Sequence, residues 1–268
     1  MIDTDFTYSP VPVDPVTLLD VIPAASGLLL ALDFDGTLAP IVQHPPDAAL
    51  LPKAKVALTS LAPRVPTAII SGRTLAELVH HFAGIDGLHL IGEHGRVWQQ
   101  PNGTVTTAQN TTAHTQKIAS VVEQLQHLLA TQPGWRIERK PAGVAVHHRN
   151  VTASDMAEMR TMVLKLFADA SHPQAPFRVL QGHKVDELVP DGVSKGTALA
   201  TLCATLPDLT PVALGDDVTD EDAFRVARQC GGMGILVSAT SHSSDASHRL
   251  AEPADVATFL TLLAARSS

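Results

Sequence analysis

Two aspartates, Asp33 and Asp35, stand one residue apart directly after an apolar run at residues 28–32. The carboxylate of Asp33 is a competent nucleophile toward phosphorus and could form an aspartyl-phosphate. Asp35, in the same turn, could give a proton to the leaving oxygen and later take one from water. Gly36 lets the backbone approach an anion closely. A plain Asp-Gly turn between strands is the alternative for this segment, but the residues downstream favour phosphoryl chemistry.

Three further positions could complete such a site. The hydroxyl of Ser71 can hold a phosphate oxygen near a helix start, or it can simply cap the helix. Lys195 could neutralise the nucleophile and the transferring phosphoryl group, although alone it resembles a surface lysine. Residues 216–222 carry five carboxylates within seven residues, which suits Mg²⁺ bound through oxygen. Helix N-terminal charge explains residues 220–222 equally well, but not Asp216.

These residues fall at the ends of predicted buried strands or at predicted helix starts. The apolar runs predict strands at residues 28–32, 67–70, 88–91, 212–214 and 233–237. Capping-box patterns at residues 74–77 and 219–222 predict two helix starts, and apolar periodicity predicts helices near residues 53–62, 194–206 and 256–263. The fold class is therefore α/β, a Rossmann-like parallel sheet with helices on both faces. In such sheets ligands bind outside the carboxyl ends of the strands.

The middle of the chain has a different pattern. Residues 108–189 are expected to run helix, strand, strand, helix, strand, strand, which suits a small antiparallel sheet carrying two helices. We therefore expect an inserted α+β domain here. The remaining expected parts are an N-terminal arm at residues 1–26 and a catalytic core made of residues 27–107 and 190–268.

The composition excludes some classes of function. The net charge of −8 argues against a nucleic-acid partner, which would require a basic surface. The apolar run before Asp33 is too short to cross a bilayer, and the first 26 residues lack the pattern of a secretory signal. The two cysteines are not spaced as a metal pair and are expected to be reduced thiols, which are typical of a reducing compartment. A cytoplasmic location is therefore expected.

The order of nucleophile, serine, lysine and acidic pair resembles that of the haloacid-dehalogenase-like phosphohydrolases. More specifically, the chain resembles the trehalose-6-phosphate phosphatases, through matching strings at residues 33–40, 71–73, 92–95, 138–140, 147–149, 182–190, 194–196 and 215–224. The resemblance implies Mg²⁺-dependent hydrolysis of trehalose 6-phosphate to trehalose and phosphate, as part of trehalose biosynthesis. It also implies that the insert is a mobile cap that closes over the sugar.

Roles for individual residues follow from the resemblance. Mg²⁺ would be held by Asp33, the backbone carbonyl of Asp35 and Asp216, with its waters positioned by Asp220. Asp33 would be the nucleophile and Asp35 the acid and base, with Ser71 and Lys195 holding phosphoryl oxygens. A disaccharide needs charged or amide side chains as hydrogen-bond partners. The residues expected to bind the substrate are Arg73, Glu93, His94, Glu138, Lys140, His147, Arg149 and Glu187.

Some alternatives stay open at this stage. The cap residues could form only a solvated sheet face. His148, His183 and Val189 depart from the family pattern and could alter sugar selectivity. A phosphatase of sucrose 6-phosphate or mannosylglycerate phosphate, or a non-catalytic sugar-phosphate sensor, are the rival functions. Expected partners are the small-molecule substrate and functional coupling to a trehalose-phosphate synthase, with no nucleic acid, no membrane and a monomeric state.

Overall fold

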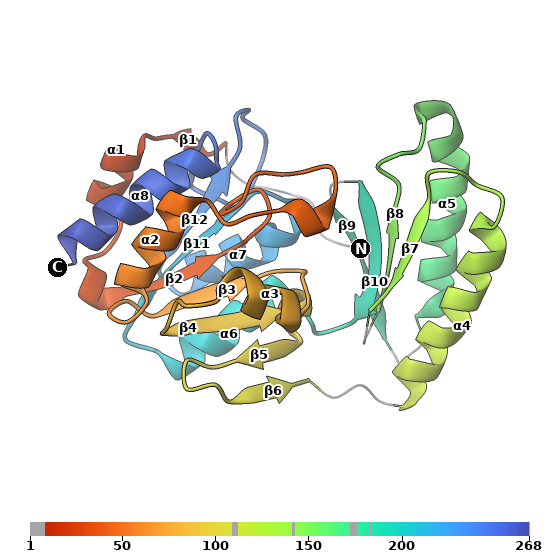
Figure 1. Ribbon diagram of the computed structural model, residues 1–268, viewed down its shortest axis with the longest axis horizontal. Helices are drawn as coiled ribbons and strands as arrows, with labels where there is room; N and C mark the ends of the chain where they lie inside the picture. The colour runs from red at the N-terminus through yellow and green to blue at the C-terminus, as the bar shows by residue number, and fades with distance from the viewer. Residues whose placement is uncertain (1–8, 109–111, 141–142, 172–175, 183, 268) are drawn as a thin grey trace. The chain divides into compact units, whose positions relative to one another are not determined.

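The computed structural model describes residues 9–108, 112–140, 143–171, 176–182 and 184–267. The chain forms two compact units (Figure 1). The first unit combines Met1–Thr107 with Ser194–Ser268, and the second consists of Ala108–Val193.

The first unit is built on one large sheet, which has nine strands in the described residues. From one edge to the other the strands are β1 (Val11–Pro12), β13 (His248–Leu250), β12 (Met233–Val237), β11 (Thr210–Gly215), β2 (Leu28–Leu32), β3 (Thr67–Ile70), β4 (Leu88–Gly92), β5 (Val97–Gln99) and β6 (Val105–Thr107). In this spatial order, all neighbouring strands from the β1 edge as far as β4 pair in parallel, and β5 and β6 then add an antiparallel edge. All five predicted strands are confirmed, and β11 is longer than expected.

Helices cover both faces of this sheet, as the continuous apolar strands predicted. The helices α1 (Pro15–Val21), α2 (Pro52–Leu61), α3 (Leu75–His81) and α8 (Pro253–Arg266) contribute to one core, and α6 (Lys195–Thr205) and α7 (Glu221–Gln229) to the other. Along β2, Leu28, Leu30 and Leu32 pack into the first core, while Leu29 and Ala31 pack into the second. This alternation follows from the two-residue period of a strand.

The start of α7 differs from the prediction. The first predicted capping box is confirmed. The side chain of Thr74 accepts from the backbone N–H of Glu77, and the side chain of Glu77 accepts from the backbone N–H of Thr74. The second was expected at residues 219–222. The capping box instead joins Asp217 to Asp220 around a short 3-10 helix, η4 (Val218–Asp220), and α7 begins at Glu221. The frame that forms is the one that turns the Asp220 carboxylate back toward the backbone of Asp217.

Part of the segment expected to form an arm belongs to the first unit. β1 pairs with β13, and α1 buries Leu18 completely. Arg266 at the end of α8 donates to the carbonyl of Leu19 at 2.6 Å.

The second unit has two helices on an antiparallel sheet, in the element order that the sequence predicted. Within the described residues the sheet has the strand order β7 (Arg136–Arg139), β8 (Val144–His147), β10 (Val185–Pro190), β9 (Phe177–Gly182). The helices are α4 (Thr112–Leu129) and α5 (Ala153–Ala170). Leu125 and Phe167 from these helices pack with Val144, Val146 and Leu188 of the sheet.

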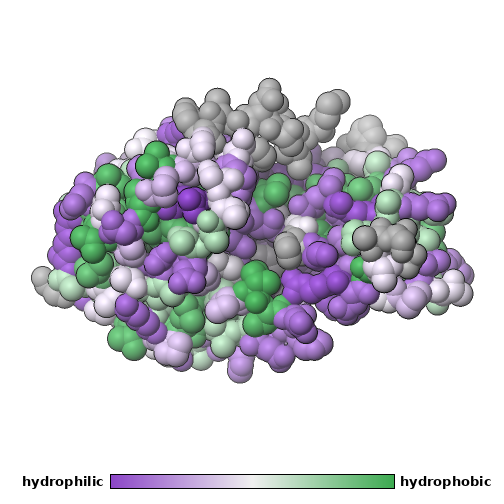
Figure 2. Space-filling model, turned by 90° about the horizontal axis from the view of Figure 1, so that it is seen from above, coloured by the Kyte–Doolittle hydropathy of each residue, from purple (hydrophilic) through white to green (hydrophobic). Residues whose placement is uncertain are grey.

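The surface shows no single apolar face in the view of Figure 2, where hydrophobic groups lie in separate clusters among hydrophilic ones. The large hydrophobic side chains most exposed in the described residues include Val16 and Val56, which lie on different helices. No helix in the described part of the chain is long and apolar enough to span a membrane.

Candidate active site

Asp33 and Asp216, predicted to act on phosphate and metal, lie directly after the ends of the neighbouring parallel strands β2 and β11. Leu32 of β2 is paired with Leu214 of β11, so the next residues of both strands emerge at the same edge of the sheet. The backbone N–H of Asp33 donates to the carbonyl of Leu214 at 2.9 Å. Within the described residues, Asp33, Asp216 and Asp220 each offer a carboxylate oxygen, and these oxygens lie within 4.8 Å of one another.

Glycines make this close approach possible. Gly36 has a φ of +84°, and a Cβ built on it would lie 2.1 Å from Oδ2 of Asp216. A Cβ on Gly215 would lie 2.1 Å from Cγ of Asp220. Both distances are shorter than any real contact of a Cβ atom, so the two carboxylates occupy the volume that any larger residue would fill.

Lys195 joins the carboxylates electrostatically. It is the first residue of α6, and its ammonium donates to Oδ1 of Asp33 and to Oδ1 of Asp220, each at 2.7 Å. All three side chains are at least 95% buried. An ammonium has three donors, so in the described part of the chain one N–H remains for an anion. Lys195 thus lies beside Asp33, as its predicted role requires, and its contact with Asp220 was not foreseen.

Burial and mutual repulsion shift the protonation of this cluster. Burial, opposed by Lys195 and helped by the charge of Asp220, raises the pKa of Asp33 to about 7. Burial and the charges of Asp33 and Asp220 raise the pKa of Asp216 to about 9. Burial lowers the pKa of Lys195, but the charges of Asp220 and Asp33 outweigh it and hold that pKa above its ordinary value. The raised pKa values show that Lys195 alone does not compensate the full ionisation of these carboxylates.

The residues present fit a divalent cation. When all are ionised, the three carboxylates and one ammonium of this buried site would have a net charge of −2, and carboxylate oxygens are the ligands that hard cations prefer. Asp220 has both oxygens engaged, one by Lys195 and one by the N–H of Asp217 at 3.1 Å. Asp33 and Asp216 are therefore the better direct ligands, and Asp220 is better placed to orient Lys195.

The acidic run divides into separate roles. Of its five carboxylates, two belong to the cluster in the described residues. Asp217 accepts from the N–H of Val218 at 2.7 Å, and Glu221 accepts from the N–H of Asp245 at 2.7 Å. Asp222 pairs with Arg225 at 3.2 Å. Helix capping, loop anchoring and an ion pair within α7 thus account for the other three. Glu221 and Asp222 lie in the first turn of α7, as the helix-charge alternative for residues 220–222 expected, whereas Asp220 belongs to the cluster.

Ser71 follows β3, the other neighbour of β2, and its side chain is buried. Its Oγ accepts from the N–H of Arg73 at 3.3 Å. Its carbonyl accepts from the N–H of His94, while the carbonyl of Arg73 accepts from Glu93. Glu93 and His94 have φ values of +53° and +57°, a strained conformation that is enriched at functional sites. The loops after β3 and β4 therefore brace each other.

Glu93 and His94, both predicted to bind substrate, are buried. The carboxylate of Glu93 pairs with Arg96 at 2.9 Å. The ring of His94 lies against Gly72, where a Cβ would approach it to 2.7 Å. Arg96 was not among the predicted residues, because a lone arginine after a glycine loop has no distinguishing sequence signal.

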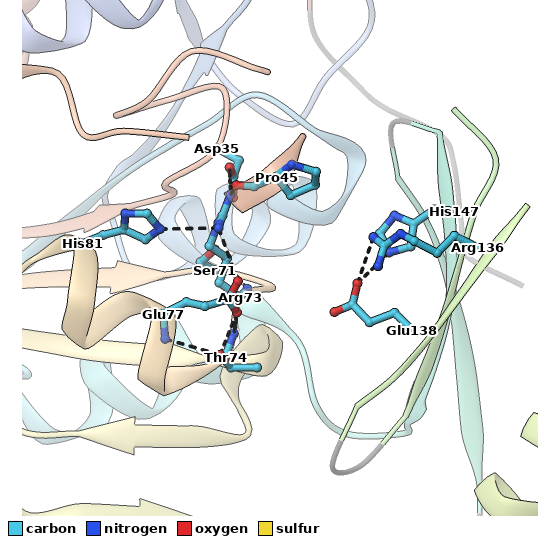
Figure 3. Close-up of polar contacts among 10 residues, drawn as sticks. All are labelled: Asp35, Pro45, Ser71, Arg73, Thr74, Glu77, His81, Arg136, Glu138 and His147. Atoms are coloured by element: carbon cyan, nitrogen blue, oxygen red, sulfur yellow. Dashed lines mark hydrogen bonds and ion pairs between the residues drawn. The ribbon is translucent and has the colours of Figure 1, made fainter. Parts of the chain in front are cut away.

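Arg73, predicted to bind substrate, makes its contacts with the protein in this structure. It forms an ion pair with Asp35, whose nearest pair of atoms is 2.7 Å apart. Figure 3 shows its guanidinium among Asp35, Pro45, Glu77 and His81. The carboxylate of Asp35 thus points to Arg73. That the backbone carbonyl of Asp35 binds the metal stays a prediction.

Four of the predicted sugar-binding residues of the second unit form two paired contacts on its sheet. Glu138 and Glu187 are both register partners of Ala145 on the strand between them, so all three side chains point to one face. Lys140 donates to Glu187 at 2.7 Å. His147 bonds Glu138 at 2.8 Å, and Figure 3 shows Arg136 at the same carboxylate. The His147 hydrogen bond lowers the pKa of Glu138 to about 2.

Two of the departures from the family pattern can be placed. His148 is buried, with Nε2 3.2 Å from the carboxylate of Asp186, which also binds Arg160. Val189 is a buried residue of β10. His183 lies outside the described residues. Arg149, predicted to bind the sugar, is half-buried in the turn after β8.

The family of the chain follows from comparison with known proteins. A family model described as trehalose-phosphatase matches residues 31–256. The chain belongs to the trehalose-phosphatase family. The matched segment includes the carboxylate cluster, Lys195 and the polar face of the second unit, so the predicted resemblance is confirmed.

This member of the trehalose-phosphatase family is similar to several individual proteins. A trehalose-phosphate phosphatase of Mycobacterium tuberculosis is 37% identical over 241 residues, covering 87% of this chain and 60% of its own length. A protein of the same organism named as an uncharacterized glycosyl hydrolase is 40% identical over 244 residues, covering 87% of this chain and 18% of its own. The chain thus spans only part of both relatives. The C-terminal domain of the Candida albicans trehalose-6-phosphate phosphatase superposes with a TM-score of 0.84 at 25% identity, covering 96% of this chain and 98% of that domain.

Proposed function

We propose that the chain hydrolyses trehalose 6-phosphate to trehalose and phosphate through an aspartyl-phosphate on Asp33, with Mg²⁺ as cofactor. The observation that carries this proposal is the buried cluster of Asp33, Lys195, Asp216 and Asp220 at the carboxyl ends of β2 and β11. Family membership supports the choice of substrate.

In the first half-reaction a carboxylate oxygen of Asp33 attacks phosphorus, and the bond from phosphorus to the sugar 6-oxygen breaks. That oxygen receives a proton from Asp35 and departs as the hydroxyl of trehalose. In the second half-reaction Asp35 takes a proton from water while the water oxygen attacks phosphorus. The acyl-phosphate bond breaks, and Asp33 returns as a carboxylate beside free phosphate.

Positioning and charge supply most of the catalysis in such a transfer. The remaining N–H of Lys195 and the hydroxyl of Ser71 are the protein donors for the equatorial phosphoryl oxygens. Lys195 is fixed at both carboxylates, so it needs little reorganisation as charge develops. Mg²⁺, held by Asp33 and Asp216 and by the backbone carbonyl of Asp35, would supply charge neutralisation for the phosphoryl group.

The polar sheet face of the second unit is the proposed recognition surface for the sugar. Trehalose is neutral and rich in hydroxyls, so its partners must both donate and accept hydrogen bonds. Glu138 and Glu187 can accept, while Lys140, His147 and Arg149 can donate. The contacts of Lys140 with Glu187 at 2.7 Å and of His147 with Glu138 at 2.8 Å fix these four groups before the sugar binds, which lowers the entropic cost of recognition. We assign to this second unit the role of the cap expected from the sequence.

The substrate is a small water-soluble phosphate ester, which suits a monomeric cytoplasmic enzyme. A trehalose-phosphate synthase is the partner that would supply the substrate. Neither a membrane nor a nucleic acid has a part in the proposed reaction.

Phosphate release from trehalose 6-phosphate, sucrose 6-phosphate and glucose 6-phosphate, each with Mg²⁺ and with a chelator, tests the proposal. Mg²⁺-dependent release that is fastest from trehalose 6-phosphate is expected. Equal rates on all three substrates would overturn the sugar specificity alone. No release from any of them would instead favour a non-catalytic sugar-phosphate sensor.

A further inference from the structure

Arg73 holds the carboxylate of Asp35 with a two-pronged ion pair. Nε donates to Oδ2 at 2.7 Å, and Nη2 donates to Oδ1 at 2.8 Å. The side chain of Arg73 is 7% exposed and that of Asp35 is 35% exposed. The planar guanidinium fork matches a carboxylate in two parallel bonds, which fixes both the position and the plane of the carboxylate.

Arg73 is itself held on every side of its guanidinium. Nη2 also donates to the carbonyl of Pro45 at 2.6 Å. Nη1 lies 3.3 Å from Oε1 of Glu77 and 3.4 Å from Nε2 of His81. The guanidinium carbon lies 5.2 Å from the centre of the Phe34 ring. All three nitrogens therefore have protein partners, which come from the loop before α2 and from α3 (Figure 3).

The backbone around Arg73 is equally constrained. Its N–H donates to Oγ of Ser71, and its carbonyl accepts from the N–H of Glu93. A Cβ on Gly92 would lie 2.8 Å from that same carbonyl, so the end of β4 approaches this residue too closely for any side chain there. Binding a sugar through Arg73 would require breaking several charge-assisted hydrogen bonds of a nearly buried side chain, at considerable cost.

We propose that Arg73 is a positioning residue that fixes the carboxyl group of Asp35 for both proton transfers, and that it does not bind the sugar. The proposal rests on the phosphatase function inferred above. The acid must lie within hydrogen-bond reach of the departing oxygen. Because Arg73 holds both oxygens, one bond can be released when Asp35 carries its proton while the other bond keeps the group in place.

The proposed role of Arg73 can be tested by comparing substrates whose leaving groups differ in their need for a proton. The alkoxide that leaves trehalose 6-phosphate needs a proton as the bond breaks, whereas p-nitrophenolate is a stable anion in neutral water. A misplaced Asp35 should therefore slow the first half-reaction of the sugar substrate and spare that of p-nitrophenyl phosphate. The ratio kcat/KM reports this half-reaction, whereas the second half-reaction, hydrolysis of the aspartyl-phosphate, is common to both substrates. A defect in the nucleophile or in the fold should slow both substrates alike.

The test compares kcat and KM for trehalose 6-phosphate and p-nitrophenyl phosphate in the wild type, Arg73→Lys, Arg73→Gln and Asp35→Asn. Lysine keeps the charge but not the two-pronged geometry. Both Arg73 variants should lower kcat/KM for the sugar phosphate by about 10²-fold and change kcat/KM for p-nitrophenyl phosphate by only a few-fold. In an Asp35→Asn background, Arg73→Lys should cause no further loss, because the two residues act as a unit.

Three results would overturn the proposal. A raised KM for trehalose 6-phosphate with unchanged kcat would make Arg73 a substrate contact. Equal losses of kcat/KM on both substrates in a folded variant would make its role general. Additive losses in the double variant would separate it from Asp35. A urea unfolding transition reports folding independently of activity. If both Arg73 variants fail to fold, Glu77→Gln replaces them, and an unchanged ratio of the two kcat/KM values then counts against the proposal.

The wild type keeps this test distinct from the test of function. A wild-type enzyme that hydrolyses p-nitrophenyl phosphate but not trehalose 6-phosphate would overturn the proposed substrate. The comparison for Arg73 would then be made with glucose 6-phosphate, which also releases an alkoxide.

Discussion

Replacing Gly36 by alanine should disable the carboxylate cluster while leaving the fold largely intact. A Cβ at this position would lie 2.1 Å from Oδ2 and 2.2 Å from Cγ of Asp216, whereas ordinary contact begins at 3.4 Å. The carboxylate of Asp216 must therefore retreat by roughly 1 Å, a displacement that can cost about 10²-fold in rate. We expect kcat/KM for trehalose 6-phosphate to fall by about that factor, and the Mg²⁺ concentration needed for half-maximal activity to rise.

Gly84 offers a matched control for the backbone. Its φ of +83° equals that of Gly36 within a degree, but nothing lies within 4 Å of a Cβ built there. Alanine should therefore cost both positions the same left-handed strain, about 1–2 kcal/mol of unfolding free energy. Urea unfolding measures that shared cost, and phosphate release measures the difference. If Gly36→Ala kept the activity and Mg²⁺ response of Gly84→Ala, the close approach of Asp216 would have no catalytic importance.

Three further predictions concern charge. Lys195→Met should lower the unfolding free energy in metal-free urea titrations by about 3–5 kcal/mol, because it leaves two buried carboxylates unpaired; a loss below about 1 kcal/mol would contradict the bridging role. A chelator should abolish turnover, and added Mg²⁺ should raise the unfolding midpoint of the wild type but not of Asp216→Asn; an equal rise in both would place the metal elsewhere. The pKa of Glu138 is lowered to about 2 by its hydrogen bond with His147, so its stabilisation is present above its ordinary value of 4.5 and is lost as pH falls toward 2. Since Glu138 is 37% exposed, we expect Glu138→Gln to cost about 1 kcal/mol at neutral pH and less than half of that near pH 3; a cost independent of pH would count against the hydrogen bond.

The local part of the site could be predicted from the sequence. The continuous apolar run at Leu28–Leu32 specifies a strand buried on both faces, and a strand of this kind places the following aspartate at the edge of a parallel sheet. The lysine at the start of α6 and the serine after β3 were found in the same way, because each is tied to the end of a predicted element.

The capping of α7 shows where local patterns become ambiguous. Both Asp217 and Thr219 are followed three residues later by an aspartate, so two overlapping capping boxes were available. The first forms, and it is the frame that leaves Asp220 within 2.7 Å of Lys195. That contact joins residues 25 positions apart, and a tertiary interaction of this kind decides between frames that propensity cannot separate.

The surroundings of Asp35 lay beyond prediction for a similar reason. Arg73 is 38 positions from Asp35 in the sequence, and it is 28 positions from Pro45, whose carbonyl it also binds. A backbone carbonyl has no residue type that could reveal its role, and an arginine after a Ser-Gly pair suits a phosphate ligand as well as a partner for a carboxylate. Only the folded arrangement of β2, β3 and α3 distinguishes these possibilities.

Steady-state phosphate release from trehalose 6-phosphate by Asp33→Asn, at saturating Mg²⁺ and beside the wild type, tests the proposed chemistry most directly. Asparagine preserves the size of the side chain and removes the nucleophile. We expect turnover to fall by at least about 10⁴-fold. A variant that retained a tenth or more of wild-type turnover would show that phosphate does not leave through an aspartyl-phosphate on Asp33.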